Sequence, residues 1–225
     1  MLVGRTSNSG TLAPPRAATV AIVAVVIAGA VGGPAWDPRR PSRVDAWAVE
    51  VLTVSRDSFP YRFASLLDDT VRTLGVLAWT VAVALTAWVL LRRWDAVVAA
   101  CVVAPATVAI EMLIKYAGRR LLAVETFGYP SGRTALATSL VLLLALILRA
   151  APVRSPIRMA VAVSGTLYVL FVGWARVATS QHSFTEVIGG VSVGVAVTLA
   201  VVLVLAGLQR GMAGAGDSAR LPEAG

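Results

Sequence analysis

Seven ionisable residues in the second half of the chain have side chains suited to binding a phosphorylated ligand. They are Lys115, Arg119, Arg120, Arg133, Arg176, His182 and Glu186. Arginine and lysine form charge-assisted hydrogen bonds to phosphate oxygens, and arginine forms them in a bidentate geometry. If the fold brings these residues together, five cations, one imidazole and one carboxylate will form a phosphate site.

Metal chemistry is not expected at this cluster. His182 is the only histidine and Cys101 the only cysteine, which excludes a metal site with two imidazoles, a cysteine cluster and an intramolecular disulfide. The acidic residues near the cluster are Glu111, Glu125 and Glu186, and cations outnumber them. We therefore expect neither a metal nor a cofactor.

The composition is that of a membrane protein. Hydrophobic residues make up 57% of the 225 residues and charged residues only 14%, whereas a soluble domain has about 25% charged residues. The net charge of +8 would suggest nucleic acid in a soluble protein. Here we assign it to arginines that flank membrane spans, and we expect no nucleic-acid partner.

Six apolar windows predict six transmembrane helices. The windows are Ala17–Trp36, Thr73–Leu91, Ala96–Ile114, Thr134–Leu148, Met159–Ala175 and Val187–Gln209. A spanning helix needs about 20 apolar residues, and the short fourth window reaches this length if Ser131–Gly132 and Ala150–Ala151 extend it. The predicted fold class is an all-α, polytopic six-helix bundle.

The polar segments around these windows define the predicted organisation. Residues 1–16 form an N-terminal tail, 17–209 the transmembrane domain, 37–72 an insert between the first two spans, and 210–225 a disordered tail. Mixed apolar and charged segments in the insert are typical of helices that lie along a membrane surface. The first window has an alternative interpretation as a signal peptide, because Ala28-Gly29-Ala30 resembles a cleavage site.

Six spans place the whole cluster at one membrane face, because successive helices alternate in direction. Both termini and two loops lie at the other face, and these segments contain nine basic residues. The segments at the cluster's face contain eleven. Five of these eleven belong to the cluster and are discounted, so the positive-inside rule predicts cytoplasmic termini and an extracytoplasmic site. Nineteen of the twenty basic residues are arginine, which indicates a GC-rich coding sequence and a bacterial plasma membrane.

Three motifs connect the cluster to a known family. They read Lys115-x6-Leu122-Ala123, Pro130-Ser131-Gly132-Arg133 and Ala175-Arg176-x5-His182-x3-Glu186. In this order they resemble the motifs of the type-2 phosphatidic acid phosphatase superfamily, which includes lipid phosphate phosphatases and is related to vanadium haloperoxidases. The family motifs read Lys-x6-Arg-Pro, Pro-Ser-Gly-His and Ser-Arg-x5-His-x3-Asp.

The resemblance implies a role for each residue. His182 is then the phosphohistidine nucleophile, and Glu186 orients its ring. The implied phosphate ligands are Lys115, Arg119, Arg120, Ser131, Gly132 and Arg176, with Arg119 or Arg120 compensating for Leu122.

Simpler interpretations of the same residues remain open. Ser183 and Glu186 also form the pattern of a capping box, and Ser131 that of a plain N-cap. Arginines at helix ends commonly snorkel to the interface. Glu111, four residues before Lys115, either neutralises that lysine or aims it at the ligand.

Arg133 is the most informative departure, because it replaces the histidine that protonates the leaving group in the family. Arginine is not deprotonated in proteins, so it cannot donate that proton. A lipid diphosphate needs it less, because a phosphate monoester with a second pKa near 6 leaves easily. We therefore predict a lipid phosphatase that prefers a lipid (polyprenyl) diphosphate.

The alternative is a catalytically impaired relative that binds phospholipid headgroups or supports a partner membrane protein. A transporter has little support, because no span in the sequence shows the paired broken-helix signature of transporters.

Overall fold

The structure, a computed structural model, describes residues 12–35, 42–122 and 128–218, and helices joined by short connections make up these residues. The helices are α1 (Ala17–Ala35), α2 (Arg43–Leu52), α3 (Phe59–Asp69), α4 (Thr73–Leu91), α5 (Trp94–Leu122), α6 (Gly132–Ala150), α7 (Ser155–Ala178) and α8 (Phe184–Ser218). The long helices coincide with the apolar windows, because a backbone in lipid must satisfy its own hydrogen bonds.

Five helices are long and apolar enough to cross a membrane. They are α4, the Trp94–Arg119 part of α5, α6, α7 and the Phe184–Met212 part of α8. The apolar part of α1 that is described with its side chains, Ala17–Gly32, is shorter. The prediction of an all-helical, multi-pass membrane protein is confirmed, and the sixth span stays a prediction.

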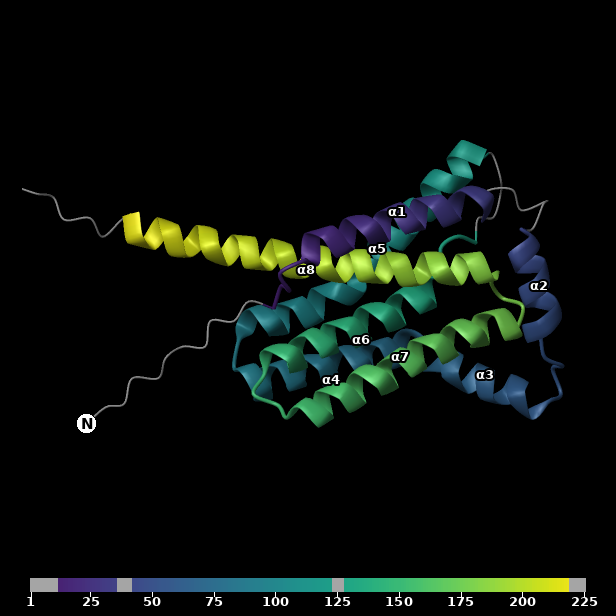
Figure 1. Cartoon of the computed structure of the whole chain (residues 1–225), viewed down its shortest axis with the longest axis horizontal. Helices are drawn as coiled ribbons and strands as arrows, with labels where there is room; N and C mark the ends of the chain where they lie inside the picture. The colour runs from purple at the N-terminus through teal and green to yellow at the C-terminus, as the bar shows by residue number, and fades with distance from the viewer. Residues whose placement is uncertain (1–11, 36–41, 123–127, 219–225) are drawn as a thin grey trace, which may run out of the picture.

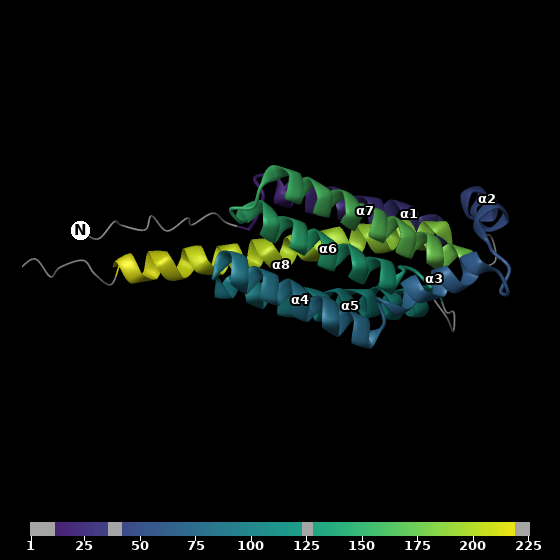
Figure 2. The same cartoon turned by 90° about the horizontal axis from the view of Figure 1, so that it is seen from below.

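The long helices run side by side, with α6 inside the bundle (Figures 1 and 2). Helix α6 packs against α4, α5, α7 and α8 and buries side chains along its whole length, including Leu140, Leu143 and Ile147. Helices α4, α6 and α8 begin, and α1, α5 and α7 end, at the end of the bundle that carries α2 and α3 (Figure 1). This alternation brings the ends of six helices that are distant in sequence to one end of the bundle (Figure 1).

Glycines allow α8 to lie close to α6. A Cβ on Gly190 would lie 2.4 Å from the carbonyl oxygen of Ser131, and one on Gly194 would lie 2.5 Å from that of Ala135. Small residues four positions apart are typical of closely packed membrane helices. The buried Ser139 hydroxyl donates to the carbonyl of Gly194 at 3.2 Å and bonds to the Thr107 hydroxyl at 2.8 Å, which ties α5, α6 and α8 together.

The insert between α1 and α4 forms two short helices that dock on the ends of α7 and α8. The backbone N–H of Val54 donates to the carbonyl of Ala178 at 3.1 Å. Phe63 of α3 contacts the rings of Phe171 and Trp174 of α7, with centroids 6.3 and 6.5 Å apart. Because α2 and α3 pack on the bundle, the insert is part of the folded unit at this end.

The C-terminal segment differs from the expectation of a disordered tail from residue 210. Helix α8 continues to Ser218, and the Arg210 side chain donates to the carbonyl of Ala206 at 3.2 Å. No proline interrupts residues 210–218, so the long apolar helix propagates into the Gly/Ala-rich sequence. Residues 219–225 and 1–11 lie outside the described residues.

Candidate active site

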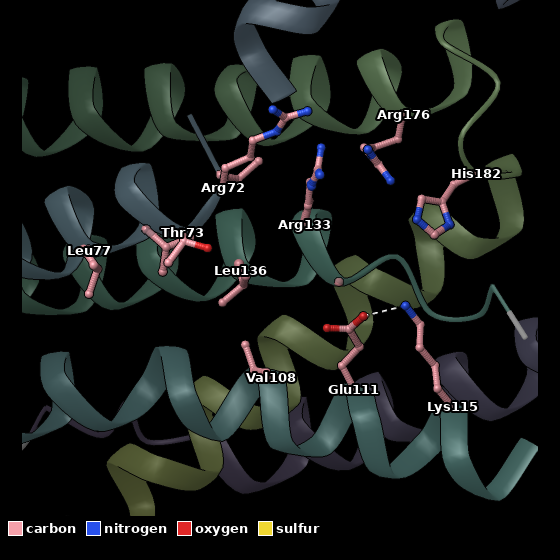
Figure 3. Close-up of a pocket in the computed structure, with 13 residues that line it drawn as sticks. Arg72, Thr73, Leu77, Val108, Glu111, Lys115, Arg133, Leu136, Arg176 and His182 are labelled. Atoms are coloured by element: carbon pink, nitrogen blue, oxygen red, sulfur yellow. Dashed lines mark hydrogen bonds and ion pairs between the residues drawn. The ribbon is translucent and has the colours of Figure 1, made fainter. Parts of the chain in front are cut away.

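A cavity of about 570 Å³ opens where the helix ends meet. Its charged lining comes from α5, α6, α7 and the segments next to α4 and α8: Arg72, Glu111, Lys115, Arg133, Arg176 and His182. Figure 3 shows the side chains of Arg72, Arg133 and Arg176 grouped on one side of the cavity, opposite Lys115, with His182 at its end. Apolar residues of α4, α5 and α6 continue the lining, among them Leu77, Val108 and Leu136.

His182 is held by a carboxylate one helical turn away. Its Nδ1 lies 2.7 Å from Oε2 of Glu186 at the start of α8. The turn after α7 places the ring, because the N–H groups of Gln181 and His182 both donate to the carbonyl of Arg176, at 3.0 and 3.1 Å. With Nδ1 directed at the carboxylate, Nε2 is the ring nitrogen left to react.

The same carboxylate also caps helix α8. Oε2 of Glu186 accepts from the Ser183 N–H at 3.0 Å, and the Ser183 hydroxyl accepts from the Glu186 N–H at 3.3 Å. This is a reciprocal capping box. The capping and the imidazole-orienting interpretations of Glu186 are therefore both realised, through one oxygen atom.

Arg133 and Arg176 converge on a carboxylate that the sequence did not point to. Nη1 of Arg176 donates to Oδ1 of Asp68 at 2.8 Å, and Nη1 of Arg133 forms an ion pair with Oδ2 of the same residue. Arg176 also donates to the side-chain oxygen of Gln181. Asp68 is 2% exposed and belongs to α3, so the insert contributes directly to this cluster.

Lys115 is paired with Glu111, as their spacing predicted. Nζ of Lys115 lies 2.6 Å from Oε1 of Glu111 on α5 (Figure 3). The Glu111 carboxylate faces the start of α6, since a Cβ on Gly132 would lie 2.2 Å from its Oε2. Glycine at position 132 leaves room for the Glu111 carboxylate at this helix N-terminus, where backbone N–H groups lack partners within the helix.

Residues 129–131, just before α6, are buried and contact α1 and α8. The Ser131 N–H donates to the carbonyl of Glu186 at 2.9 Å, and Tyr129 packs on Gly189, where a Cβ would lie 2.2 Å from the ring. Burial raises the pKa of Tyr129 to about 12, so its hydroxyl stays protonated and donates to the carbonyl of Ala28 in α1. These contacts fix the start of α6 relative to His182.

Two predicted phosphate ligands, Ser131 and Arg119, are not among the residues that line the cavity. The Ser131 side chain is buried and bonds to the Thr134 hydroxyl at 3.0 Å, without capping α6. Arg119 is exposed, because it lies one helical turn beyond Lys115, past the cavity. The side chain of Arg120, like residues 123–127 with Glu125, lies outside the described residues.

Two buried aspartates of the insert were missed. Asp45 accepts from the backbone N–H of Thr185 at 2.8 Å and from its hydroxyl at 2.9 Å, and so caps α8 from a distant segment. Asp68 and Asp69 occupy the last turn of α3, where the helix dipole disfavours negative charge. That local conflict was the available signal for Asp68.

Each predicted cation of the cavity lining, like the imidazole, has a carboxylate partner. Lys115 faces Glu111, His182 faces Glu186, and Arg133 and Arg176 share Asp68. In the part of the chain that the structure describes, no group of three His, Cys, Asp or Glu residues is placed to hold a metal ion. The arrangement combines an oriented imidazole with positioned cations, which suits the binding and transfer of an anionic group.

Fold and site together define a helical, multi-pass membrane protein with a cavity that arginines, a lysine and a histidine line. The family model of the PAP2 superfamily matches residues 114–210, which include Lys115, Arg133, Arg176 and His182. This part of the chain is similar to the PAP2 superfamily, the family that the motifs resemble.

A solved structure shares the fold. It is described as the crystal structure of the first transmembrane PAP2 type phosphatidylglycerolphosphate phosphatase from Bacillus subtilis. The TM-score is 0.60 at 15% sequence identity, and the match covers 87% of this chain and 96% of that one. No curated protein sequence matches the chain.

Proposed function

We propose that the chain is an integral membrane lipid phosphatase that acts through a phosphohistidine on His182. The observation that carries this proposal is the His182–Glu186 pair, 2.7 Å long, which lies beside a cavity that Lys115, Arg133 and Arg176 also line. The match of residues 114–210 to the PAP2 superfamily model and the fold shared with a transmembrane PAP2 type phosphatase support it.

The reaction follows from the positions of these groups. Nε2 of His182 attacks phosphorus, the bond from phosphorus to the leaving oxygen breaks, and Glu186 stabilises the positive charge that the ring gains. Arg133, Arg176 and Lys115 neutralise the phosphoryl oxygens. Water then attacks phosphorus, the P–N bond breaks, and inorganic phosphate and the free imidazole are released.

We further propose that the preferred substrate is a lipid diphosphate of the polyprenyl type. Arg133 stands where a general acid would protonate the leaving oxygen, and its guanidinium is ion-paired with Asp68. A diphosphate expels a phosphate monoester that is stable as an anion, whereas a monophosphate expels an alkoxide. Arg133 then stabilises the charge that develops on the leaving group, as positioned arginines do in phosphoryl transfer.

The proposed topology has six spans in a bacterial plasma membrane. Residues 17–209 form the membrane domain, α1 is the first span, both termini are cytoplasmic, and the site with the insert 37–72 is extracytoplasmic. The balance of flanking arginines supports this orientation. A reporter at the C-terminus is expected on the cytoplasmic side and one at Pro41 on the opposite side. Two reporters on one side would contradict six spans.

A second candidate is an impaired relative that binds lipid headgroups or supports a partner protein. The specific observation that favours it is the engagement of both Arg133 and Arg176 by Asp68. The two candidates differ in turnover, so phosphate release by the folded, purified protein separates them.

The deciding experiment compares kcat/KM for the monophosphate and the diphosphate of one lipid in detergent. We expect the diphosphate to be hydrolysed faster. Arg133→His is expected to narrow the difference by raising monophosphate turnover, because general acids contribute about 10²–10⁴-fold. Equal rates for both substrates would refute the leaving-group argument. Complete inactivity of both folded variants would favour the binding candidate.

A further inference from the structure

Asp68 reaches the centre of the site from a helix that lies outside the long-helix bundle. Its side chain is 3% exposed and contacts Arg133 of α6 and Arg176 of α7. Helix α3 packs on α7, where Phe63 contacts Phe171 and Trp174. The anchoring of α3 therefore determines whether the Asp68 carboxylate stays at the guanidiniums.

The local sequence does not favour an acidic residue at this position. Asp68 lies in the last turn of α3, where carbonyl groups give the helix end a partial negative charge. Burying a carboxylate there is tolerated only because two arginines compensate its charge. A residue that breaks a local preference in this way is expected at a functional position.

The Asp68 carboxylate pairs with the same two guanidiniums that would bind a phosphoryl group. One oxygen contacts Nη1 of Arg176 at 2.8 Å, and the other is paired with Nη1 of Arg133. Nε of Arg176 is buried and has no hydrogen-bond partner among the described residues, so this guanidinium still has a donor for another oxygen. Guanidiniums form charge-assisted hydrogen bonds to carboxylate and to phosphate oxygens alike, so either anion can occupy the position between the two arginines.

We propose that Asp68 is a built-in competitor for the phosphate site, and that it thereby sets the affinity for substrate and for released phosphate. The inference rests on the proposed function, in that a phosphoryl group must use Arg133 and Arg176. A phosphoryl group that binds these guanidiniums must displace the Asp68 carboxylate or share the guanidiniums with it. The competition lowers the affinity for inorganic phosphate and so favours its release after hydrolysis.

The direction in which phosphate affinity changes when Asp68 is replaced distinguishes a competing role of Asp68 from a purely structural one. If Asp68 only held the two arginines in place, its removal would loosen them and weaken phosphate binding. If Asp68 competes, its neutralisation frees two guanidiniums and strengthens phosphate binding. Asp68→Asn keeps the size and one acceptor oxygen and removes the charge, so it tests the competition with little change in packing.

The test is the binding of inorganic phosphate to the full-length protein in detergent, measured by isothermal titration calorimetry. We expect the dissociation constant of Asp68→Asn to be at least tenfold lower than that of the unmodified protein. Asp68→Glu restores the charge and is expected to bind as weakly as the unmodified protein. Asp57→Asn removes the same charge from an exposed position of the insert and is expected to change the constant less than twofold.

Equal or weaker binding by folded Asp68→Asn would overturn the competitor role and leave the proposed phosphatase intact. Absence of phosphate binding in every variant would overturn the proposed phosphate site as well. Circular dichroism checks the helical fold. If Asp68→Asn does not fold, Phe63→Ala provides the second variant, because it weakens the hold of α3 on α7 and keeps Asp68. It is expected to bind phosphate at least threefold more tightly, and unchanged binding would overturn the proposal.

Discussion

Replacing Glu186 by Gln removes one negative charge from the site and keeps the hydrogen bonds and the size of the side chain. Oε2 accepts two hydrogen bonds, from His182 at 2.7 Å and from the Ser183 N–H at 3.0 Å. A glutamine oxygen has two lone pairs and can accept both. The amide nitrogen then takes the place of Oε1, which faces Gly128, where a Cβ would lie only 2.2 Å away. Glycine at position 128 leaves room for either group.

The magnitude follows from the charge that His182 gains during attack on phosphorus. An imidazolium and a carboxylate about 4 Å apart attract each other by about 4 kcal/mol at an effective dielectric constant near 20. Loss of 4 kcal/mol from the transition state corresponds to about a 10³-fold decrease in rate. Because both partners are partly exposed, at 11% and 18% of their side chains, we expect solvent to reduce the decrease to about 10²–10³-fold.

The assay is phosphate release from a lipid diphosphate in detergent, with kcat and KM determined separately. The decrease is expected in kcat, because the charge on His182 develops in the transition state. The thermal stability of Glu186→Gln should match that of the unmodified protein, since the capping box is retained. Glu186→Ala is expected to lose the same activity and, in addition, about 1 kcal/mol of stability.

Glu50→Gln is the matched control, because it makes the same exchange at an exposed position of α2 and should leave kcat unchanged. A folded Glu186→Gln protein with kcat within fivefold of the unmodified protein would refute the reasoning. Glu186 would then serve only as the cap of α8.

Two further predictions concern the packing that holds the site. Gly190→Ala brings a Cβ to 2.4 Å from the Ser131 carbonyl, so we expect a loss of about 1–3 kcal/mol of stability, measured by thermal unfolding in detergent. Gly207→Ala, on the same helix with nothing within 4 Å, is the control and should be neutral or stabilising; equal effects would show that α6 and α8 are not in close contact. Asp45→Ala leaves the Thr185 N–H without its acceptor and is expected to cost about 1–3 kcal/mol, whereas Glu50→Ala on the same helix should have little effect. An unchanged melting temperature for Asp45→Ala would mean that the insert does not stabilise the start of α8.

The parts of the site that the sequence predicted depend on local geometry. Glu186 lies one helical turn after His182, and Lys115 one turn after Glu111, so each pair meets whatever the rest of the fold does. Arg133 and Arg176 lie at the ends of apolar windows whose alternating directions bring them to one face. Periodicity and hydrophobicity were sufficient for these positions.

The missed residues depend on contacts between distant segments. Asp45 has a local explanation at the start of α2, where its N–H donates to the Ser42 hydroxyl at 3.1 Å, and this hides its role at Thr185. Asp68 belongs to a short amphipathic helix whose charges are usually solvated, and only the docking of α3 buries it. Arg119 was predicted as a nearby cation that compensates for Leu122, but α5 carries it past the cavity.

The most direct test of the central claim is detection of the phosphoenzyme. The protein is mixed with a lipid diphosphate, quenched within one turnover at alkaline pH, and analysed by mass spectrometry of its peptides. The account predicts phosphate on the imidazole of His182, no phosphorylated peptide in His182→Ala, and no turnover by that variant, since the chain has no second histidine. Continued turnover by folded His182→Ala, or turnover of the unmodified protein with no phosphate on His182, would contradict it.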